Sequence, residues 1–401
     1  MKIGNLIVLI IFSLTSFLLR AEEKDIKKTI EEGPYVETAQ TGITLSGYVD
    51  AGYTYNFVGR GSTINNRAYN DDANNRGDFN LHAVKLVLEK PLSDANELQA
   101  GFRADLFFGE DAGNLGTNNG AANQSDSISL QQGYIQFRLP YANGIDFAVG
   151  KFASLLGYEC VERPVNMNIT LGNVAAIDPS WYTGVRVNYE WCENLEAIFA
   201  VGNCNGLDNG PGLDNINDEI VLTGALNMIS TEEDRANLQI GFHYAPDGDS
   251  GYALENETVL IGNLLGNWKP KFANDKLCLG FNASLATFND FSNPVAAPTD
   301  DSSAFFGVAL YGKYQFTDLF SVAQRLEYAH TDDDQYLALG GVGITSNDLW
   351  GYTITSGFDF TEECLLRAEY RIDWGDDLVA TTGADSSGPA HTAALEAVYS
   401  F

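Results

Sequence analysis

The sequence is poor in basic residues, proline, methionine and long apolar runs. It has 23 Lys and Arg against 54 Asp and Glu, which gives a formal net charge of −31. Binding to nucleic-acid phosphates requires clustered basic residues, so no nucleic-acid partner is expected. Beyond the first 20 residues, no apolar run reaches the length of a membrane-spanning helix. In contrast, Gly (40), Tyr (19) and Phe (23) are abundant, a composition typical of many short strands and turns.

The N-terminal segment predicts export. Lys2 is followed by an apolar run from Leu6 to Leu19 and then by charged residues, which is the pattern of a secretory signal peptide over residues 1–21. Leu19 and Arg20 make the cleavage site near Ala21 imperfect, so an uncleaved membrane anchor is the alternative. Residues 22–42 are charged and poor in large apolar side chains, and we interpret them as a periplasmic lead-in.

From residue 43 onward, apolar and polar residues alternate in one repeated pattern. The stretch CLLRAEYRIDW sets four apolar residues against four charged ones, namely Leu366, Ala368, Tyr370 and Ile372 against Arg367, Glu369, Arg371 and Asp373. A charged row of this kind is hard to place in a soluble sandwich. It fits a tube whose apolar face meets lipid and whose charged face meets water.

Connections between these strands alternate between seven short turns and eight long Asn/Asp/Gly-rich stretches. This alternation predicts about sixteen antiparallel strands, although 257–268 alternates poorly and fourteen or eighteen remain possible. Backbone groups in lipid must all be hydrogen-bonded, so the sheet must close. We therefore predict an all-β, transmembrane antiparallel barrel over residues 43–401, with short periplasmic turns and long extracellular loops.

The end of the sequence, HTAALEAVYSF, continues the alternation to Phe401 and predicts a last strand that closes the barrel against the first. The VYSF ending, with Tyr399 and Phe401, is similar to the signal read by the outer-membrane assembly machinery. The stretches SGYVDAGYTYNF, GIDFAVGKFASLLGYE and PSWYTGVRV resemble the OmpL-like β-barrel porin family, and the resemblance covers residues 46–401. It implies a bacterial outer-membrane protein, embedded among the lipids, that forms a water-filled channel for ions and small hydrophilic solutes. Assembly as a homotrimer is the corresponding expectation.

The third long connection, residues 153–180, is the longest and the least polar. General porins fold their third loop inward to narrow the pore, and this segment matches in position and length. Its apolar residues suit a loop packed inside the barrel. Its charged residues are the candidates for lining a constriction, namely Glu159, Glu162, Arg163 and Asp178.

Strand parity predicts which charged side chains face the lumen. The candidates are Lys85, Arg103, Asp105, Arg138, Arg186, Arg325, Arg367 and Arg371. These could pair across strands and simply hydrate the interior, or they could set up a field opposite the loop acids. Acidic outer loops would attract cations and a basic wall would favour anions, so the sequence leaves selectivity open. Aromatic residues near strand ends predict interfacial girdles, with a sugar-stacking channel as the alternative.

Other functions have weaker support. Acidic stretches such as NDDANN and TDDDQ could bind calcium, but they lack regular ligand spacing, so no cofactor is predicted. Cys160 and Cys204 are both expected on the outer side and could form a disulfide or remain free thiols. An enzyme is not expected, because the four histidines have no catalytic neighbours in sequence. A structural or adhesive envelope barrel with a plugged lumen is the remaining alternative.

Overall fold

The computed structural model describes most of the predicted barrel. The described residues are 42–57, 62–64, 77–114, 128–205, 220–230, 235–248, 257–291, 301–331, 337–339, 342–344, 348–375, 379–381 and 389–401. The predicted signal peptide, nearly all of the lead-in and much of the long outer loops, including the acidic stretches considered for calcium, lie outside them. Among the described residues, no helix is long and apolar enough to cross a membrane.

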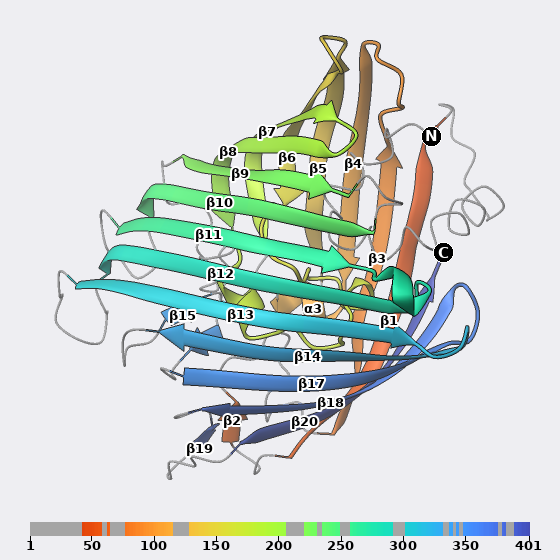
Figure 1. Ribbon diagram of the computed structural model, residues 1–401, viewed down its shortest axis with the longest axis vertical. Coiled ribbons are helices and arrows are strands. Elements are labelled where there is room, and N and C mark those ends of the chain that lie inside the picture. The colour runs from red at the N-terminus through yellow and green to blue at the C-terminus, as the bar shows by residue number, and fades with distance from the viewer. Residues whose placement is uncertain are drawn as a thin grey trace.

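Sixteen antiparallel strands form one closed barrel, as predicted. Figure 1 shows them tilted across the molecule, in the order in which they follow one another along the chain. Their bounds are β1 Thr44–Asn56, β3 Asp78–Lys90, β4 Gln99–Phe108, β5 Ile128–Leu139, β6 Ile145–Ala153, β7 Trp181–Cys192, β8 Leu195–Asn205, β9 Val221–Ile229, β10 Ala236–Gly248, β11 Glu257–Trp268, β12 Leu277–Phe291, β13 Asp301–Gln315, β14 Phe320–Thr331, β17 Asp348–Asp359, β18 Cys364–Gly375 and β20 Ala390–Ser400.

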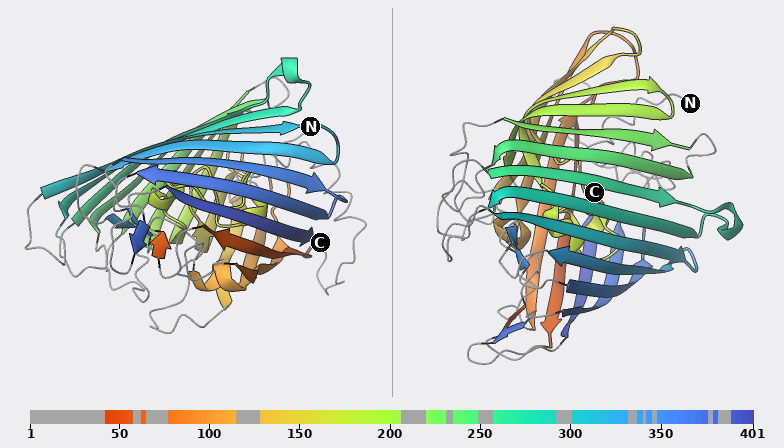
Figure 2. Two further views of the ribbon diagram at one scale, coloured as in Figure 1. Left: turned by 90° about the horizontal axis from the view of Figure 1, so that it is seen from below. Right: turned by 60° about the vertical axis from the view of Figure 1, so that its left-hand side comes forward.

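The seven predicted short turns and eight predicted long connections all join barrel strands in the expected alternation. Figure 2 shows the short turns gathered at one end of the barrel. Small elements lie in the connections. They are α3 Glu110–Asn114, the 3₁₀ turns η3 Arg163–Val165, η4 Val174–Ile177 and η5 Lys271–Ala273, and two short paired ribbons, β2 Ser62–Ile64 with β19 Val379–Thr381 and β15 Leu337–Leu339 with β16 Val342–Ile344.

Alternation along each strand places polar residues inside and apolar residues outside. In β14, Arg325 and Glu327 are at most 1% exposed, whereas Leu326 between them is 44% exposed. Successive side chains of a strand point to opposite faces of the sheet, so one strand serves both environments. The charged row is therefore inside the barrel and the apolar row is on its outer surface, as the sequence predicted.

The barrel closes where β1 pairs with β20. Thirteen-residue β1 lies between β20 and β3, and both pairings are antiparallel. At the edge of this seam, the Gly47 amide donates to the Phe401 carbonyl and the Phe401 amide donates to the Gly47 carbonyl, both at 2.9 Å. The expectation that the last strand closes against the first is confirmed.

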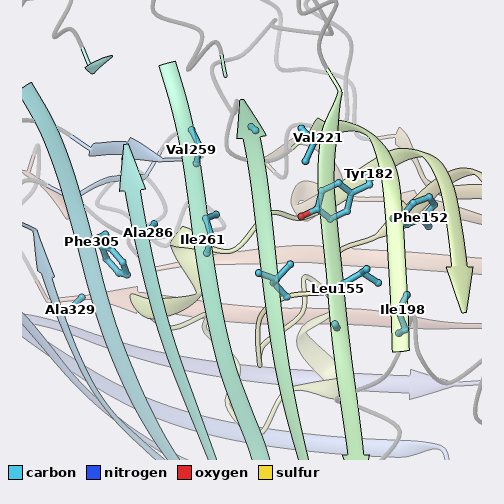
Figure 3. Packing of buried hydrophobic residues seen from close by; sticks show 14 of the residues in the cluster. Phe152, Leu155, Tyr182, Ile198, Val221, Val259, Ile261, Ala286, Phe305 and Ala329 are labelled. Carbon is cyan, nitrogen blue, oxygen red and sulfur yellow. The ribbon is translucent and has the colours of Figure 1, made fainter. Parts of the chain in front are cut away.

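Strand β11 is the segment whose alternation looked poor, and it is a regular barrel strand. Its inward residues Val259, Ile261 and Leu265 are apolar and at most 6% exposed. They are buried because apolar parts of the 153–180 loop pack against them: Val259 and Ile261 share one inner cluster with Leu155, and Leu265 shares another with Tyr158. Figure 3 shows Leu155 and Phe152 among the inward side chains of the strands from β7 to β14. The alternation fails here because the inner face meets protein instead of water.

Candidate functional site

The 153–180 loop lies inside the barrel and forms the candidate site. It connects β6 to β7, and Figure 1 shows it as the yellow-green segment behind β10 to β13. Ile169 and Val174 are 0% exposed, although they belong to a loop. A loop on the outer surface would expose such residues, so the predicted inward course is what the structure describes.

Acidic wall residues accept hydrogen bonds from the backbone of this loop. Glu369 on β18 accepts from the Ile169 and Thr170 amides and from the Thr170 hydroxyl. Glu327 on β14 accepts from the Asn173 amide at 2.6 Å and from the Val174 amide at 3.3 Å. Buried backbone amides need partners, and here side-chain carboxyl oxygens of the wall supply them.

Basic wall residues hold the loop by its carbonyl groups. Arg367 on β18 donates to the Asn166 carbonyl at 2.7 Å and to the Arg163 carbonyl at 2.8 Å. Arg371 donates to the Leu171 carbonyl, and Arg325 donates to the Thr170 carbonyl at 2.6 Å. Strands β14 and β18, which lie on either side of β17, therefore hold the same stretch of loop through both donors and acceptors.

The side chains of all four charged loop residues predicted for the constriction contact residues outside the loop, three of them on barrel strands and one on α3. Glu159 accepts from Arg325 at 2.6 Å, and Glu162 pairs with Lys85 on β3. The Arg163 guanidinium donates to both carboxylate oxygens of Asp111 in α3, at 2.7 and 2.9 Å. The fourth, Asp178, accepts from the Ser284 hydroxyl of β12 at 3.2 Å.

The remaining predicted wall residues also face the lumen. Arg103 bonds to Asp105 and Glu89, and Arg138 bonds to both oxygens of Asp146. The guanidinium of Arg186 lies over two aromatic rings, with its Cζ atom 5.7 Å from the Tyr134 centroid and 5.3 Å from the Phe152 centroid. Arg103, Arg138 and Arg186 are placed as predicted, but the contacts that hold the loop are made by Lys85, Arg325, Arg367 and Arg371.

An aromatic contact fixes the first part of the loop on strands β11 and β13, farther round the same side of the barrel as β14. Tyr158 stacks on Tyr311 of β13 with 4.1 Å between ring centroids, and its hydroxyl donates to the Asn267 side chain of β11. A Cβ atom at Gly280 of β12 would lie only 2.1 Å from the Tyr158 hydroxyl oxygen. Glycine at 280 therefore leaves the space that the Tyr158 ring occupies.

Burial raises the pKa values of two loop residues. Loss of solvation raises the pKa of the Asp178 carboxyl to about 7, against a lowering effect of its hydrogen bond from Ser284. Burial also raises the pKa of the Cys160 thiol well above its usual value. Cys160 is a free thiol whose Sγ atom faces the Glu162 carbonyl and the Asn166 side chain. The side chain of Cys204 lies outside the described residues.

Sequence reasoning did not identify two residues that form contacts inside the barrel, Asp111 and His82. Asp111 was hidden in a long loop, and nothing in its local pattern marks it as the partner of Arg163. His82 is inside because β3 has one extra residue opposite β1, between Leu81 and Ala83. A signal for this was present, since the polar positions of the strand change from even to odd numbers after His82, between Asn80 and Lys85.

Comparisons with known proteins agree with this geometry. Residues 42–401 match the family described as "Putative beta-barrel porin-2, OmpL-like". No curated protein matches the sequence. Solved structures with a similar fold include the outer-membrane channel DcaP of Acinetobacter baumannii, with a TM-score of 0.59 and 13% identity over 92% of this chain and 100% of that one.

Two further porins share the fold at low identity. The anion-selective porin from Comamonas acidovorans has a TM-score of 0.58 and 10% identity over 90% of this chain and 99% of that one. The trimer form of OmpT from Vibrio cholerae has a TM-score of 0.55 and 10% identity over the same shares. Together with the closed barrel, the charged lumen and the inward loop, the family match over residues 42–401 leads to one conclusion: the chain belongs to the OmpL-like β-barrel porins, a family of outer-membrane channels for passive diffusion.

Proposed function

We propose that the chain passes ions and small hydrophilic solutes through a pore narrowed by the 153–180 loop. The observation that carries this proposal is the double attachment of the loop. Its ends leave β6 and enter β7, while its backbone is held by Glu369 and Glu327 and by the three arginines of β14 and β18, and Tyr158 is held on β11 and β13. A loop fixed across a lumen sets the width available to a solute.

We further propose that the pore prefers cations. Arg325, Arg367 and Arg371 are each paired with a carboxylate and also donate to loop carbonyls, so their charge is compensated. Buried acidic side chains outnumber buried basic ones among the described residues. The long outer connections are acidic in sequence, which would raise the local cation concentration at the mouth.

The cellular setting completes the proposal. We infer that residues 1–21 are removed on export and that Tyr399 and Phe401 are read by the outer-membrane assembly machinery. A homotrimer is proposed because OmpT, which has a similar barrel, is described in a trimer form. Outer-membrane lipids would then contact the apolar face wherever a neighbouring subunit does not cover it.

The decisive experiment is conductance of the refolded chain in a planar lipid bilayer, with the reversal potential measured under a salt gradient. We expect uniform conductance steps and a reversal potential whose sign indicates that cations pass more readily than anions. A reversal potential of the sign for anions would overturn the proposed preference and leave the pore itself intact.

A folded, heat-modifiable barrel that gave no steps would overturn the open-pore proposal. In that case the apolar packing of Leu155 and its neighbours would describe a plug, and a structural or adhesive envelope role would replace diffusion. Liposome swelling with sugars of increasing size separates a general channel from one selective for sugars. A general channel is expected to show a smooth decline in rate with solute size.

A further inference from the structure

Three buried side chains that the channel function does not use meet at the barrel seam. Asp50 is on β1, His82 on β3 and Glu396 on β20, and these are three neighbouring strands. They are 0%, 1% and 3% exposed. Each offers one nitrogen or oxygen atom to a common point, and these atoms all lie within 4.8 Å of one another.

The backbone is adapted to bring His82 to this point. The register of β1 and β3 shifts at Asp50, so His82 is the extra residue of a β-bulge and faces inward together with Ala83. A bulge commonly re-aims a side chain in this way. On the facing strand, a Cβ atom at Gly52 would lie 2.4 Å from the His82 Cε1 atom. Glycine at 52 therefore provides the space that the imidazole ring fills.

Two carboxylate oxygens of the cluster are left without hydrogen-bond donors. These are Asp50 Oδ2 and Glu396 Oε1, both buried. Their other oxygens are used, since Asp50 Oδ1 lies 3.0 Å from His82 Nδ1 and Glu396 Oε2 accepts from Arg367. A buried carboxylate oxygen without a partner is unfavourable, so two of them beside an imidazole point to a missing positive ligand.

The charges around the cluster are compatible with a bound divalent cation. Asp50 and Glu396 supply two carboxyl groups, and Arg367 contacts only one oxygen of Glu396. Arg163 and Asp111, which also lie near Asp50, are paired with each other. An imidazole nitrogen with two carboxylate oxygens is a donor set typical of zinc and related transition-metal ions, whereas calcium prefers oxygen ligands alone.

We propose that Asp50, His82 and Glu396 form a binding site for a divalent transition-metal ion of the zinc class. Bonds of about 2.0–2.2 Å to such an ion require the three side chains to draw slightly closer than in the present geometry. A bound ion would link the first, second and last barrel strands. It would also steady Glu396, and through it Arg367, which holds the 153–180 loop.

The test is zinc retention by the full chain. Wild-type protein is refolded from EDTA-treated, unfolded chain with excess Zn²⁺, passed through gel filtration to remove weakly held ions, and analysed by plasma mass spectrometry. The matched pair of variants is His82→Gln and His243→Gln. His243 is also a buried lumen histidine, but it bonds to Tyr182 on the far side of the barrel.

The proposal expects one zinc ion per chain in wild type and in His243→Gln, with a loss of about tenfold or more in affinity in His82→Gln. Wild type that retains no zinc, or His82→Gln that retains as much as His243→Gln, would overturn it. If His82→Gln does not fold, Co²⁺ in wild type decides the matter. Strong visible ligand-field bands support the enclosed site, and a spectrum like that of the hydrated ion overturns it.

Discussion

The guanidinium of Arg325 donates to the carboxylate of Glu159 at 2.6 Å and thereby joins strand β14 to the first part of the 153–180 loop. Both side chains are at most 2% exposed, and Arg325 also lies 3.3 Å from Glu327 on its own strand. Because neither Arg325 nor Glu159 has access to bulk water, removal of one leaves the other as an uncompensated buried charge.

Replacing Arg325 by Gln is therefore expected to release the loop. The change leaves Glu159 without its cation and Glu327 with only Arg371, at a cost of about 3–5 kcal/mol in the free energy of unfolding. The single-channel conductance should rise because the loop no longer spans the lumen. Bilayer recordings of the refolded variant check this.

Arg138→Gln is the matched control for that variant. Arg138 is also a buried lumen arginine and bonds to both oxygens of Asp146, but its partners lie beside a short turn, away from the loop. It should lose stability with an unchanged conductance step. Equal conductance in wild type and folded Arg325→Gln would show that this ion pair does not hold the constriction.

Gly280→Val tests the loop without changing any charge. The new side chain would enter the space of the Tyr158 ring, which overpacks the site at a cost of about 1–3 kcal/mol and pushes the loop from the β12 wall. Conductance and its open-channel noise should both increase. Gly262→Val on β11 is the control, since a Cβ atom there meets no atom within 4 Å. Similar noise in the two variants would contradict the predicted contact.

Phe401→Ala separates the assembly signal from barrel closure. The backbone hydrogen bonds between residues 401 and 47 persist without the ring, so refolding in detergent should give a heat-modifiable barrel like wild type. In cells, the amount of folded protein in the outer membrane should fall if the ring is read by the assembly machinery. If the variant fails to refold in detergent, the Phe401 ring contributes to the stability of the barrel. If the variant reaches wild-type amounts in the outer membrane of cells, the assembly machinery does not read the ring.

Asp178 should make stability depend on pH. Its pKa rises from 3.8 to about 7 on folding, so between these values the unfolded chain loses a proton that the folded chain keeps. This contribution to stability is complete below about pH 4 and is lost as the pH rises to about 7, by roughly 1–4 kcal/mol. Asp178→Asn should reduce this loss of stability. The measurement is the temperature at which heating changes the gel mobility of the barrel, recorded at several pH values between 4 and 8. Asp275→Asn, at an exposed turn, should not reduce the loss.

Thiol labelling tests the cysteine assignment. Cys192 is exposed, whereas Cys278 is buried and Cys160 is partly buried, with a thiol pKa well above its usual value. A maleimide should modify Cys192 in the folded protein within minutes and Cys160 only after unfolding. Mass spectrometry after unfolding without reductant should find Cys160 labelled. An unlabelled Cys160 under those conditions would instead support the predicted disulfide with Cys204.

The barrel could be predicted from the sequence because its two environments impose opposite demands on neighbouring residues. Arg367 and Leu366 differ in polarity because one faces the lumen and the other faces outward, and this contrast repeats in most strands. Prediction weakened where an inner face is apolar, as in β11 with Val259 and Ile261. There, periodicity carries no information, because both sides of the strand are dry.

The candidate site could be predicted only in outline. The inward course of residues 153–180 followed from length, position and low polarity, and its four charged residues contact residues outside the loop. Their partners could not be assigned, because Glu159 and Arg325, or Arg163 and Asp111, are remote in sequence and meet only through the closed barrel. His82 was missed because a single extra residue in β3 changes which parity faces inward.

The hydrogen bonds between Gly47 and Phe401 have a consequence for the time course of folding. They join residues near opposite ends of the described chain, so the entropy lost on closing this loop is the largest that any strand pair of the barrel incurs. The other fifteen neighbouring pairs can form locally while β1 and β20 are still open edges. Unpaired edges invite aggregation, so the interval before closure is when the chain most needs protection by another protein or by the membrane surface.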